Sequence, residues 1–332
     1  MATKLPLTFA CGPYDRMESL AKGDVRPAGI DLNYISIDHP RDTFDRMIGG
    51  MEFDVSEMSS SEYICRYASG DRDLVAIPVF PLRSFRHNFI AVNTDIIKKP
   101  SDLNGKRIGV QLYTMTAAVW IRGILANAGV DLSTITWIEG AIEKPGPHGE
   151  ANPKPLLRPI KRIPNENPSK SLSQLLEDGE IAATIGAQLP PCLGKARNVH
   201  RLFPNVRQTE KEYYRETGIF PIMHVVVLKK ELVDKYPFIS TSLFNAMNDS
   251  KDIAMRRLRF SGGSRYMLPF MQSNIQEIDE LFGGDPWPYG LEANRKTLEA
   301  LVSFLYDQAM IPRKVPLEEL FAHTCGHNIK TV

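Results

Sequence analysis

Short apolar runs alternate with segments of helical spacing along the first two thirds of the chain. The apolar runs predict strands at residues 5–10, 30–37, 53–58, 75–79, 107–110, 134–138 and 181–185. The segments between them predict helices at residues 14–22, 40–48, 60–68, 117–127 and 171–176. This alternation predicts an α/β fold with mixed, mostly parallel sheets flanked by helices.

Two continuous apolar runs each begin just after a histidine. One run, 89–93, follows Arg86-His87, and the other, 225–228, follows Met223-His224. Such runs suit strands that are buried on both faces. We expect them to lie side by side and to connect two lobes, with both histidines near the floor of the cleft between the lobes. One lobe would then comprise residues 1–88 plus 226–332, and the other residues 89–225.

The composition of two further regions predicts their secondary structure. Residues 145–168 are crowded with prolines and basic residues, which predicts a long loop. The chain after residue 229 is mostly helical, with helices expected at 230–235, 240–259, 275–281 and 291–308. In a fold of this kind the ligand binds between the lobes, at the carboxyl ends of the strands.

Composition narrows the function classes. The formal net charge of the 332 residues is +1, so no general field favours nucleic acid or a membrane surface. No apolar run approaches the roughly 20 residues of a membrane span. The segment 4–11 is too short for an export signal and is interrupted by Pro6. We therefore expect a cytoplasmic protein whose four cysteines, which lack any pairwise motif spacing, are reduced thiols.

Three polar turns follow predicted strands and begin predicted helices. These turns are 11–16, with Tyr14 and Arg16; 59–61, with Ser59, Ser60 and Ser61; and 111–116, with Gln111, Thr114 and Thr116. The start of a helix favours carboxylate or phosphate. Hydroxyl side chains at these positions are also ordinary helix caps, so each turn alone has both interpretations. Arg16, Arg83 and Arg86 are near the predicted cleft, and guanidinium groups there favour an anionic ligand.

His224 and Glu57 are the main candidates for acid–base chemistry. His224 precedes a buried run, so it is either a core histidine or the acid/base group of a site. Glu57 shares a strand face with Phe53 and Val55, where a carboxylate needs a partner. It is either paired with a buried arginine or tuned for acid–base work or ligand contact. The tail His323-Thr-Cys-Gly-His327 is not expected to hold a metal, because no further ligands complete a site.

Several runs of residues resemble the 4,5-dihydroxyphthalate decarboxylase family. The most specific are Gly-Ile-Phe-Pro-Ile-Met-His at 218–224 and Pro-Tyr-Gly-Leu-Glu-Ala-Asn-Arg at 288–295; weaker matches are Tyr-Asp-Arg at 14–16, Gly-Ile-Asp-Leu at 29–32 and Phe-Asp-Val-Ser-Glu-Met-Ser at 53–59. The similarity spans about residues 9–320. It implies the two-lobed fold of type 2 periplasmic binding proteins, such as binders of thiamine precursors and taurine. It also implies a cytoplasmic enzyme of aromatic catabolism.

The resemblance implies conversion of 4,5-dihydroxyphthalate to 3,4-dihydroxybenzoate and carbon dioxide. One ring hydroxyl is para to the departing carboxylate, so its electron donation makes the ipso carbon basic enough to be protonated. We expect His224 to be the acid, with Glu57 or His87 assisting the phenol. The carboxylates would be held by Arg16, Arg83 and Arg86, with Ser59, Ser60, Ser61, Thr114 and Thr116. Further substrate contacts are expected from Tyr14, Gln111 and Phe220. This route requires no cofactor or metal; the expected partner is a small aromatic dicarboxylate, and we expect a homo-oligomer.

Two other functions fit the same sequence. One is a solute-binding protein for an aromatic or sulfonated anion, which would use the same scaffold. The other is a decarboxylase of another hydroxylated aromatic acid, with or without the assistance of a metal.

Overall fold

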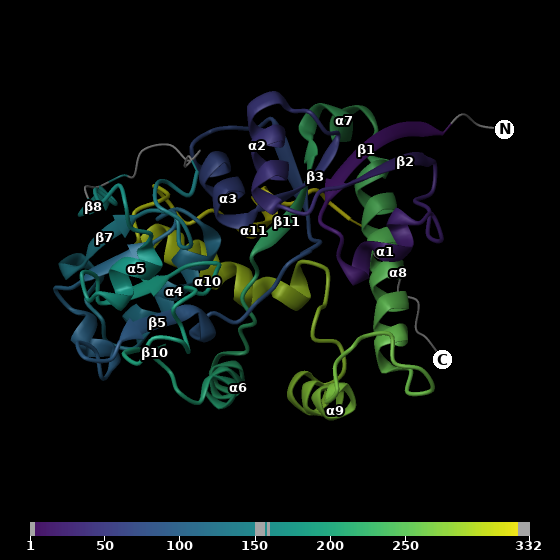
Figure 1. Cartoon of the computed structure of the whole chain (residues 1–332). Coiled ribbons are helices and arrows are strands. Elements are labelled where there is room, and N and C mark those ends of the chain that lie inside the picture. Colours follow the sequence, from purple (N-terminus) through teal and green to yellow (C-terminus); the bar gives the residue numbers. More distant parts are fainter. Residues whose placement is uncertain (1–3, 150–156, 158–159, 325–332) are drawn as a thin grey trace.

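The computed structural model describes residues 4–149, 157 and 160–324, which form two lobes that are each built on one β-sheet (Figure 1). In the first lobe the strand order is β2-β1-β3-β11-β4, and in the second it is β10-β5-β9-β6-β7-β8. The first sheet contains β1 (Leu5–Cys11), β2 (Ile30–Ser36), β3 (Val55–Ser59), β4 (Leu74–Ile77) and β11 (His224–Lys229). The second contains β5 (Ile90–Asn93), β6 (Arg107–Val110), β7 (Thr136–Glu139), β8 (Arg162–Pro164), β9 (Ala183–Ile185) and β10 (Val199–Arg201).

Helices cover both sheets. Those that precede β9 are α1 (Asp15–Ala21), α2 (Pro40–Gly50), α3 (Ser60–Ala68), α4 (Thr116–Asn127) and α5 (Leu172–Glu177). Those that follow β9 are α6 (Val206–Thr217), α7 (Lys230–Lys235), α8 (Phe238–Arg259), α9 (Met271–Phe282), α10 (Arg295–Asp307) and α11 (Leu317–Leu320). A short 3-10 turn, η1 (His87–Phe89), leads into β5. The predicted α/β class with two mixed sheets and a helical C-terminal region is confirmed.

The prediction that the two buried runs lie side by side is wrong. β5 pairs with β9 and β10 in the second sheet, whereas β11 is inserted antiparallel between β3 and β4 in the first. Each run is a central strand that needs two neighbours of its own, and a run of apolar residues does not say which sheet supplies them. The crossing segments meet just upstream, where Arg83 forms an isolated antiparallel bridge with Ile222. His224 and Val225 consequently belong to the sheet of the first lobe.

The structure also contains regular elements where the sequence predicted none. Strand β8 lies inside the segment 145–168, where its residues pair with β7 as an edge strand that tolerates Pro164. Helix α6 and strand β10 have no counterpart in the prediction. α6 is charged over most of its surface and has no fully buried residue, so it lacks the apolar periodicity that reveals a helix.

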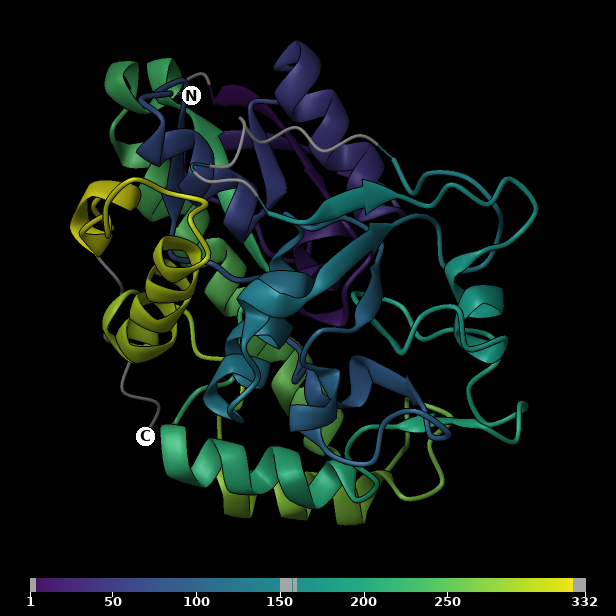
Figure 2. The same cartoon turned by 90° about the vertical axis from the view of Figure 1, so that its left-hand side faces the viewer.

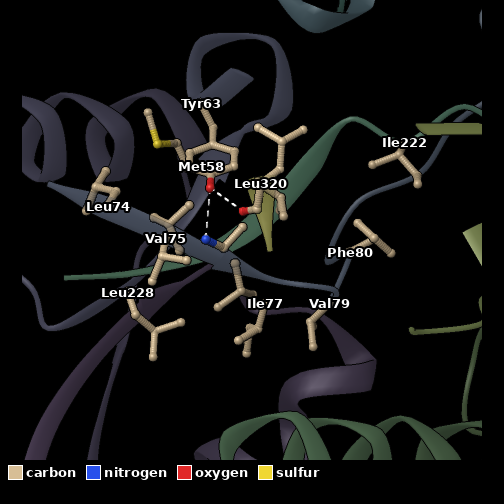
Figure 3. Packing of buried hydrophobic residues seen from close by; sticks show 14 of the residues in the cluster. Met58, Tyr63, Leu74, Val75, Ile77, Val79, Phe80, Ile222, Leu228 and Leu320 are labelled. Carbon is tan, nitrogen blue, oxygen red and sulfur yellow. Dashed lines mark hydrogen bonds between the residues drawn. The ribbon is translucent and has the colours of Figure 1, made fainter. Parts of the chain in front are cut away.

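The core of the first lobe is continuous around β11 and β4. Figure 3 shows the packing of Tyr63 from α3 among Met58, Val75, Ile77 and Leu228. The Tyr63 hydroxyl accepts a hydrogen bond from the Ala76 N–H at 3.1 Å and donates one to the Leu320 carbonyl (Figure 3). One phenol therefore ties α3, β4 and α11 together inside an apolar core.

The two lobes are joined by a second contact away from the crossing segments. α10, whose buried apolar residues belong to the core of the first lobe, packs against α4 of the second lobe, and the two helices lie together in Figure 1. Trp120 of α4 belongs to the core of the first lobe and donates its indole N–H to the Ile222 carbonyl at 2.9 Å. On another side of the molecule α6 and α9 run next to each other (Figure 2), linked by an ion pair between Arg207 and Glu277.

No helix in the described part of the chain has both the length and the apolar character needed to cross a bilayer. Within the same residues the three cysteines are buried and unpaired, and Cys325 lies outside the described residues.

Candidate active site

A cavity of about 290 Å³ lies between the lobes. Its walls come from both lobes and from the crossing segments, which contribute Leu82, Arg86, Met223 and His224. This is the position that the two-lobed fold assigns to a ligand. The size is at the lower end of small-molecule sites and suits a single substituted ring.

His224 and Glu57 form a buried pair at one wall. The two side chains are brought together because β11 pairs with β3, with His224 opposite Ser59. His224 Nδ1 and Glu57 Oε1 are 2.5 Å apart, and the Glu57 side chain is completely inaccessible to solvent. The ring lines the cavity and packs edge-on against Phe44 of α2, with ring centroids 5.0 Å apart. Since Nδ1 is occupied, Nε2 is the ring nitrogen that is available for proton transfer.

Glu57 is held as a carboxylate. Burial by itself would raise its pKa, but His224 and hydrogen bonds from the Gly12 N–H (3.0 Å) and the Tyr14 hydroxyl (2.7 Å) lower it below the ordinary value. A carboxylate can only accept, so His224 Nδ1 carries a hydrogen and donates it to Glu57, and the ring exchanges protons with the cavity through Nε2. The same carboxylate, together with burial, raises the pKa values of Tyr14 and Cys11, so both remain neutral donors.

Arg86 supplies a buried positive charge, which Glu210 offsets only at longer range. Its side chain is 4% exposed and lines the cavity, and it forms no ion pair within the described residues. Its Nε donates only to the Met223 sulfur at 3.0 Å, and the guanidinium lies 4.7 Å from the ring centre of Phe89. Burial lowers its pKa to about 10, which still leaves it charged at neutral pH. A buried unpaired guanidinium is costly, so a bound anion would stabilise it.

Three helices begin at the cavity: α2 at Pro40, α3 after Ser59 and α4 at Thr116. None of the three caps, His39, Ser59 and Met115, accepts a side-chain hydrogen bond from its own helix start. The dipoles of the three helices add to the positive potential near Arg86, although at α3 the N–H groups of Ser60 and Ser61 already donate to the Met223 carbonyl and the Thr116 hydroxyl.

The second lobe contributes a neutral, hydrogen-bonding wall. Gln111 Oε1 accepts from the Ala187 N–H at 3.1 Å, which turns its amide nitrogen toward Gln188 Oε1 (2.6 Å) and His148 Nδ1 (3.3 Å). His148 Nδ1 is consequently the acceptor and Nε2 carries the hydrogen. Burial and the nearby Arg41 lower the pKa of His148, so the ring is neutral. The polar groups at the cavity thus include neutral hydrogen-bonding groups as well as charges.

Comparison with known proteins assigns the chain to a family. It is 34% identical over 322 residues to a 4,5-dihydroxyphthalate decarboxylase of Comamonas testosteroni, with 96% of this chain and 97% of that protein covered. The chain belongs to the 4,5-dihydroxyphthalate decarboxylase family. A protein of the same name from Pseudomonas putida is 35% identical over 221 residues, covering 64% of this chain and 82% of that protein. The predicted resemblance is confirmed, and the protein is a decarboxylase, that is, a carboxy-lyase. No family model matches the sequence.

Solved structures confirm the fold. The aliphatic sulphonate binding protein SsuA from Escherichia coli matches with a TM-score of 0.51 at 12% identity, covering 100% of this chain and 96% of that protein. The alkanesulfonate-binding protein SsuA from Xanthomonas axonopodis pv. citri, bound to MOPS, matches with a TM-score of 0.52 at 12% identity, covering 98% and 100%. This decarboxylase therefore has the fold of periplasmic binding proteins.

Five of the predicted site residues line the cavity of the decarboxylase. They are His224, Ser59, Arg86, Gln111 and Thr116. Glu57 lies one step behind, through its contact with His224; its partner is this histidine and not the arginine that the sequence suggested. Of the three turns that were predicted to place a helix start at the ligand, two, 59–61 and 111–116, contribute residues to the cavity wall.

Tyr14 and Arg16 do not line the cavity. Tyr14 points at Glu57 from behind, and the Arg16 Nε donates to the Pro81 carbonyl at 2.5 Å. The Arg16 guanidinium lies over the rings of Tyr14 and Trp287, at 4.2 and 4.5 Å from their centres. Helix α2 takes the place at the cavity that the sequence assigned to α1, because α1 packs along α8 on the outside of the sheet.

Arg83, Phe220 and His87 also lie elsewhere. Arg83 is buried against the side chain of Asn294, and its guanidinium lies 5.5 Å from the ring centre of Phe220. Phe220 stacks near Phe85, with ring centres 4.7 Å apart, in an aromatic cluster beside α9. His87 packs between the rings of Phe203 and Tyr213, so no contact supports its predicted role at the phenol.

The remaining hydroxyls join the lobes. Ser61 Oγ donates to the Thr114 carbonyl at 2.9 Å, and the Thr116 hydroxyl is 2.9 Å from both Ser59 Oγ and Ser61 Oγ. Ser60, Ser61 and Thr114 are buried but absent from the cavity wall. The hydroxyls of Ser59, Ser61 and Thr116 thus bind one another across the lobe boundary, whereas those of Ser60 and Thr114 are buried without a hydrogen-bond partner in the described part of the chain.

Sequence reasoning missed His39, Arg41, Phe44, Glu62, His148 and Gln188, which all line the cavity. His148 lies in the proline-rich segment 145–168, which the composition predicted to be a long loop. Glu62 was detectable as an acidic residue in the first turn of a helix at a predicted site, although that position is also ordinary for a surface carboxylate.

Within the described residues no group of three or more His, Cys, Asp or Glu side chains is placed to hold a metal. Cys325 and His327 of the histidine-containing tail lie outside the described residues.

Proposed function

We propose that this decarboxylase converts 4,5-dihydroxyphthalate to 3,4-dihydroxybenzoate and carbon dioxide. The observation that carries the proposal is the combination of groups at one cavity: the protonatable His224 held by Glu57, and the unpaired buried guanidinium of Arg86. The first supplies a proton and the second attracts a carboxylate. The names of the two bacterial relatives give the same substrate.

The reaction can be written with these groups. The ring hydroxyl para to the departing carboxylate donates electron density to the ipso carbon. His224 Nε2–H transfers its proton to that carbon, so a C–H bond forms and the ring is briefly dienone-like. The bond from the ring to the carboxylate then breaks as carbon dioxide leaves, and its electron pair restores the aromatic ring. Glu57 stabilises the imidazolium that must form again before the next turnover.

The substrate carboxylates are expected near Arg86 and the starts of α3 and α4. The retained carboxylate keeps its charge throughout, so it binds equally well before and after proton transfer. The departing carboxylate loses its charge as carbon dioxide forms. A water-poor cavity favours that loss because it does not solvate the ionised group as bulk water does.

The direct test measures carbon dioxide release from a panel of aromatic acids. The panel contains 4,5-dihydroxyphthalate, 4-hydroxyphthalate, phthalate and 3,4-dihydroxybenzoate, each with and without a chelator. We expect release from the first compound, weaker release from the second, and none from phthalate, which has no hydroxyl to activate the ipso carbon. Rapid release from phthalate, or none from 4,5-dihydroxyphthalate, would contradict the proposal.

We also propose a cytoplasmic location, which the buried unpaired thiols of Cys11, Cys65 and Cys192 favour. Fractionation of cells that produce the natural protein tests this.

A further inference from the structure

Glu62 is a buried carboxylate at the cavity that the proposed mechanism does not use. It lies in the first turn of α3, is 3% exposed and forms part of the cavity wall. Its Oε1 accepts a hydrogen bond from Arg41 Nη1 at 2.6 Å. Its Oε2 is buried and has no hydrogen-bond partner within the described residues.

An unpartnered buried carboxylate oxygen requires an explanation. Most buried polar atoms in folded proteins have a partner, and leaving one without a donor costs free energy. Arg41 cannot serve both oxygens, because its other nitrogens bind Asp45. A ligand that donates a hydrogen bond would complete the site.

The negative charge of Glu62 decides which group of a ligand can donate the missing hydrogen bond. A carboxylate would be repelled, so the substrate carboxylates belong near Arg86. A phenolic hydroxyl, in contrast, is a strong donor that suits an ionised acceptor. His148 lies near Arg41, and burial together with this arginine lowers the pKa of His148. The ring is therefore neutral and does not add a second positive charge beside Glu62.

We propose that Glu62 Oε2 accepts a hydrogen bond from a phenolic hydroxyl of the substrate, with Arg41 as the residue that positions the carboxylate. The inference rests on the proposed function and adds the orientation of the ring: hydroxyls toward Glu62, carboxylates toward Arg86. Hydrogen bonding to the hydroxyl that is para to the departing carboxylate raises electron density at the ipso carbon. Glu62 therefore both selects hydroxylated rings and assists protonation by His224.

The test uses two ligands that lack the carboxylate removed in the reaction. Calorimetry measures the Kd of 3,4-dihydroxybenzoate and of benzoate for the wild type and for Glu62→Gln. We expect the wild type to prefer the dihydroxylated acid by roughly 10- to 100-fold, the range for a hydrogen bond to a charged group. Glu62→Gln should lose most of this preference, while its Kd for benzoate stays within about twofold of the wild-type value.

The matched control is Glu52→Gln. Glu52 is also paired with one arginine, Arg46, but it is about half exposed and outside the cavity, so its loss should leave both Kd values unchanged. Circular dichroism and melting temperature establish that Glu62→Gln is folded. If it is not, the wild-type measurements still decide, because equal Kd values for the two acids would overturn the proposal.

The outcomes separate the inference from the proposed function. A wild type that releases carbon dioxide from 4,5-dihydroxyphthalate, together with a folded Glu62→Gln that keeps the full preference for hydroxylated acids, refutes the role of Glu62 alone. A preference that depends on Glu62 without any carbon dioxide release refutes the proposed reaction and retains the binding role.

Discussion

At the residue scale, the role of each charged side chain at the cavity depends on its hydrogen-bond and ion-pair partners. Glu57 has three hydrogen-bond donors besides the thiol of Cys11, whereas Arg86 forms no ion pair within the described residues and interacts with Glu210 only at longer range. A fully satisfied buried carboxylate is a fixed structural charge. An unsatisfied buried guanidinium is a site for a ligand. Two charged residues that are equally buried can thus have opposite roles, and burial alone does not distinguish them.

His224→Ala should lower kcat by roughly 10²- to 10⁴-fold, the range for loss of a general acid. The melting temperature should fall only modestly, because the ring faces the cavity and its removal leaves Glu57 with its other donors. Both quantities are measured on one preparation. A variant that melts far below the wild type but turns over normally would make His224 a core residue.

Arg86→Ala should raise KM at least tenfold, since the loss of a buried charge-assisted contact costs about 2–5 kcal/mol. Arg83→Ala is the control: this arginine is equally buried, but it binds Asn294 and lies outside the cavity wall. We expect it to lower stability and to leave KM near the wild-type value. Steady-state kinetics of the two variants decide the point; the reverse assignment would place the substrate beside Arg83.

At the scale of elements, the cavity is surrounded in large part by the first residues of helices. The sequence identified α3 and α4 as helices that begin at the site, because each follows a strand directly. It chose α1 as the third, whereas α2 occupies that place. The choice depends on which side of the sheet a helix packs. Helix α6 was not predicted at all; it covers η1 and encloses His87 through Tyr213.

The burial of His87 makes stability depend on pH. Burial lowers the pKa of His87 to about 4, from an ordinary value of 6.5. Between these two values the unfolded chain binds a proton and the folded protein does not, so the free energy of unfolding rises with pH. The full change is roughly 3 kcal/mol for this residue. This contribution to the free energy of unfolding is present in full above about pH 6.5, and it is lost as the pH falls from about 6.5 to 4.

His87→Phe keeps the ring packing and removes the titration. Urea unfolding at pH 4.5 and 7 should therefore show a smaller pH effect in the variant than in the wild type. Equal pH dependence in the two proteins would show that His87 is protonated freely in the folded state.

At the scale of the whole molecule, the lobes are fastened at two places. One is the crossing between Arg83 and Ile222, and the other is the contact between α4 and α10. The second contact is close: a Cβ atom at Gly123 of α4 would lie 2.6 Å from Phe304 Cζ of α10. Buried Arg122 reinforces it by donating to Gln308 Oε1 at 2.7 Å. We expect the lobes to unfold as one cooperative unit.

Gly123→Ala should lower the free energy of unfolding by about 1–3 kcal/mol, the usual cost of overpacking. Gly50→Ala is the matched control, because Gly50 is helical in α2 and has open space around its Cβ position. It should raise stability by about 0.5–1 kcal/mol, the difference in helix propensity. Urea unfolding of both variants tests the pair; a neutral Gly123→Ala would mean that the two helices separate easily.

The sequence by itself determined the α/β class, most of the elements and the importance of His224, Glu57 and Arg86. These follow from local patterns: apolar runs, helix periodicity, and charged residues placed where the pattern requires burial. Only the tertiary structure decided which sheet each buried run joins, that α2 and not α1 meets the cavity, and that Arg83 and Arg16 are occupied elsewhere. Those outcomes depend on contacts between residues far apart in the chain. Glu62 and His148 became visible for the same reason, because their roles depend on which atoms lie opposite them.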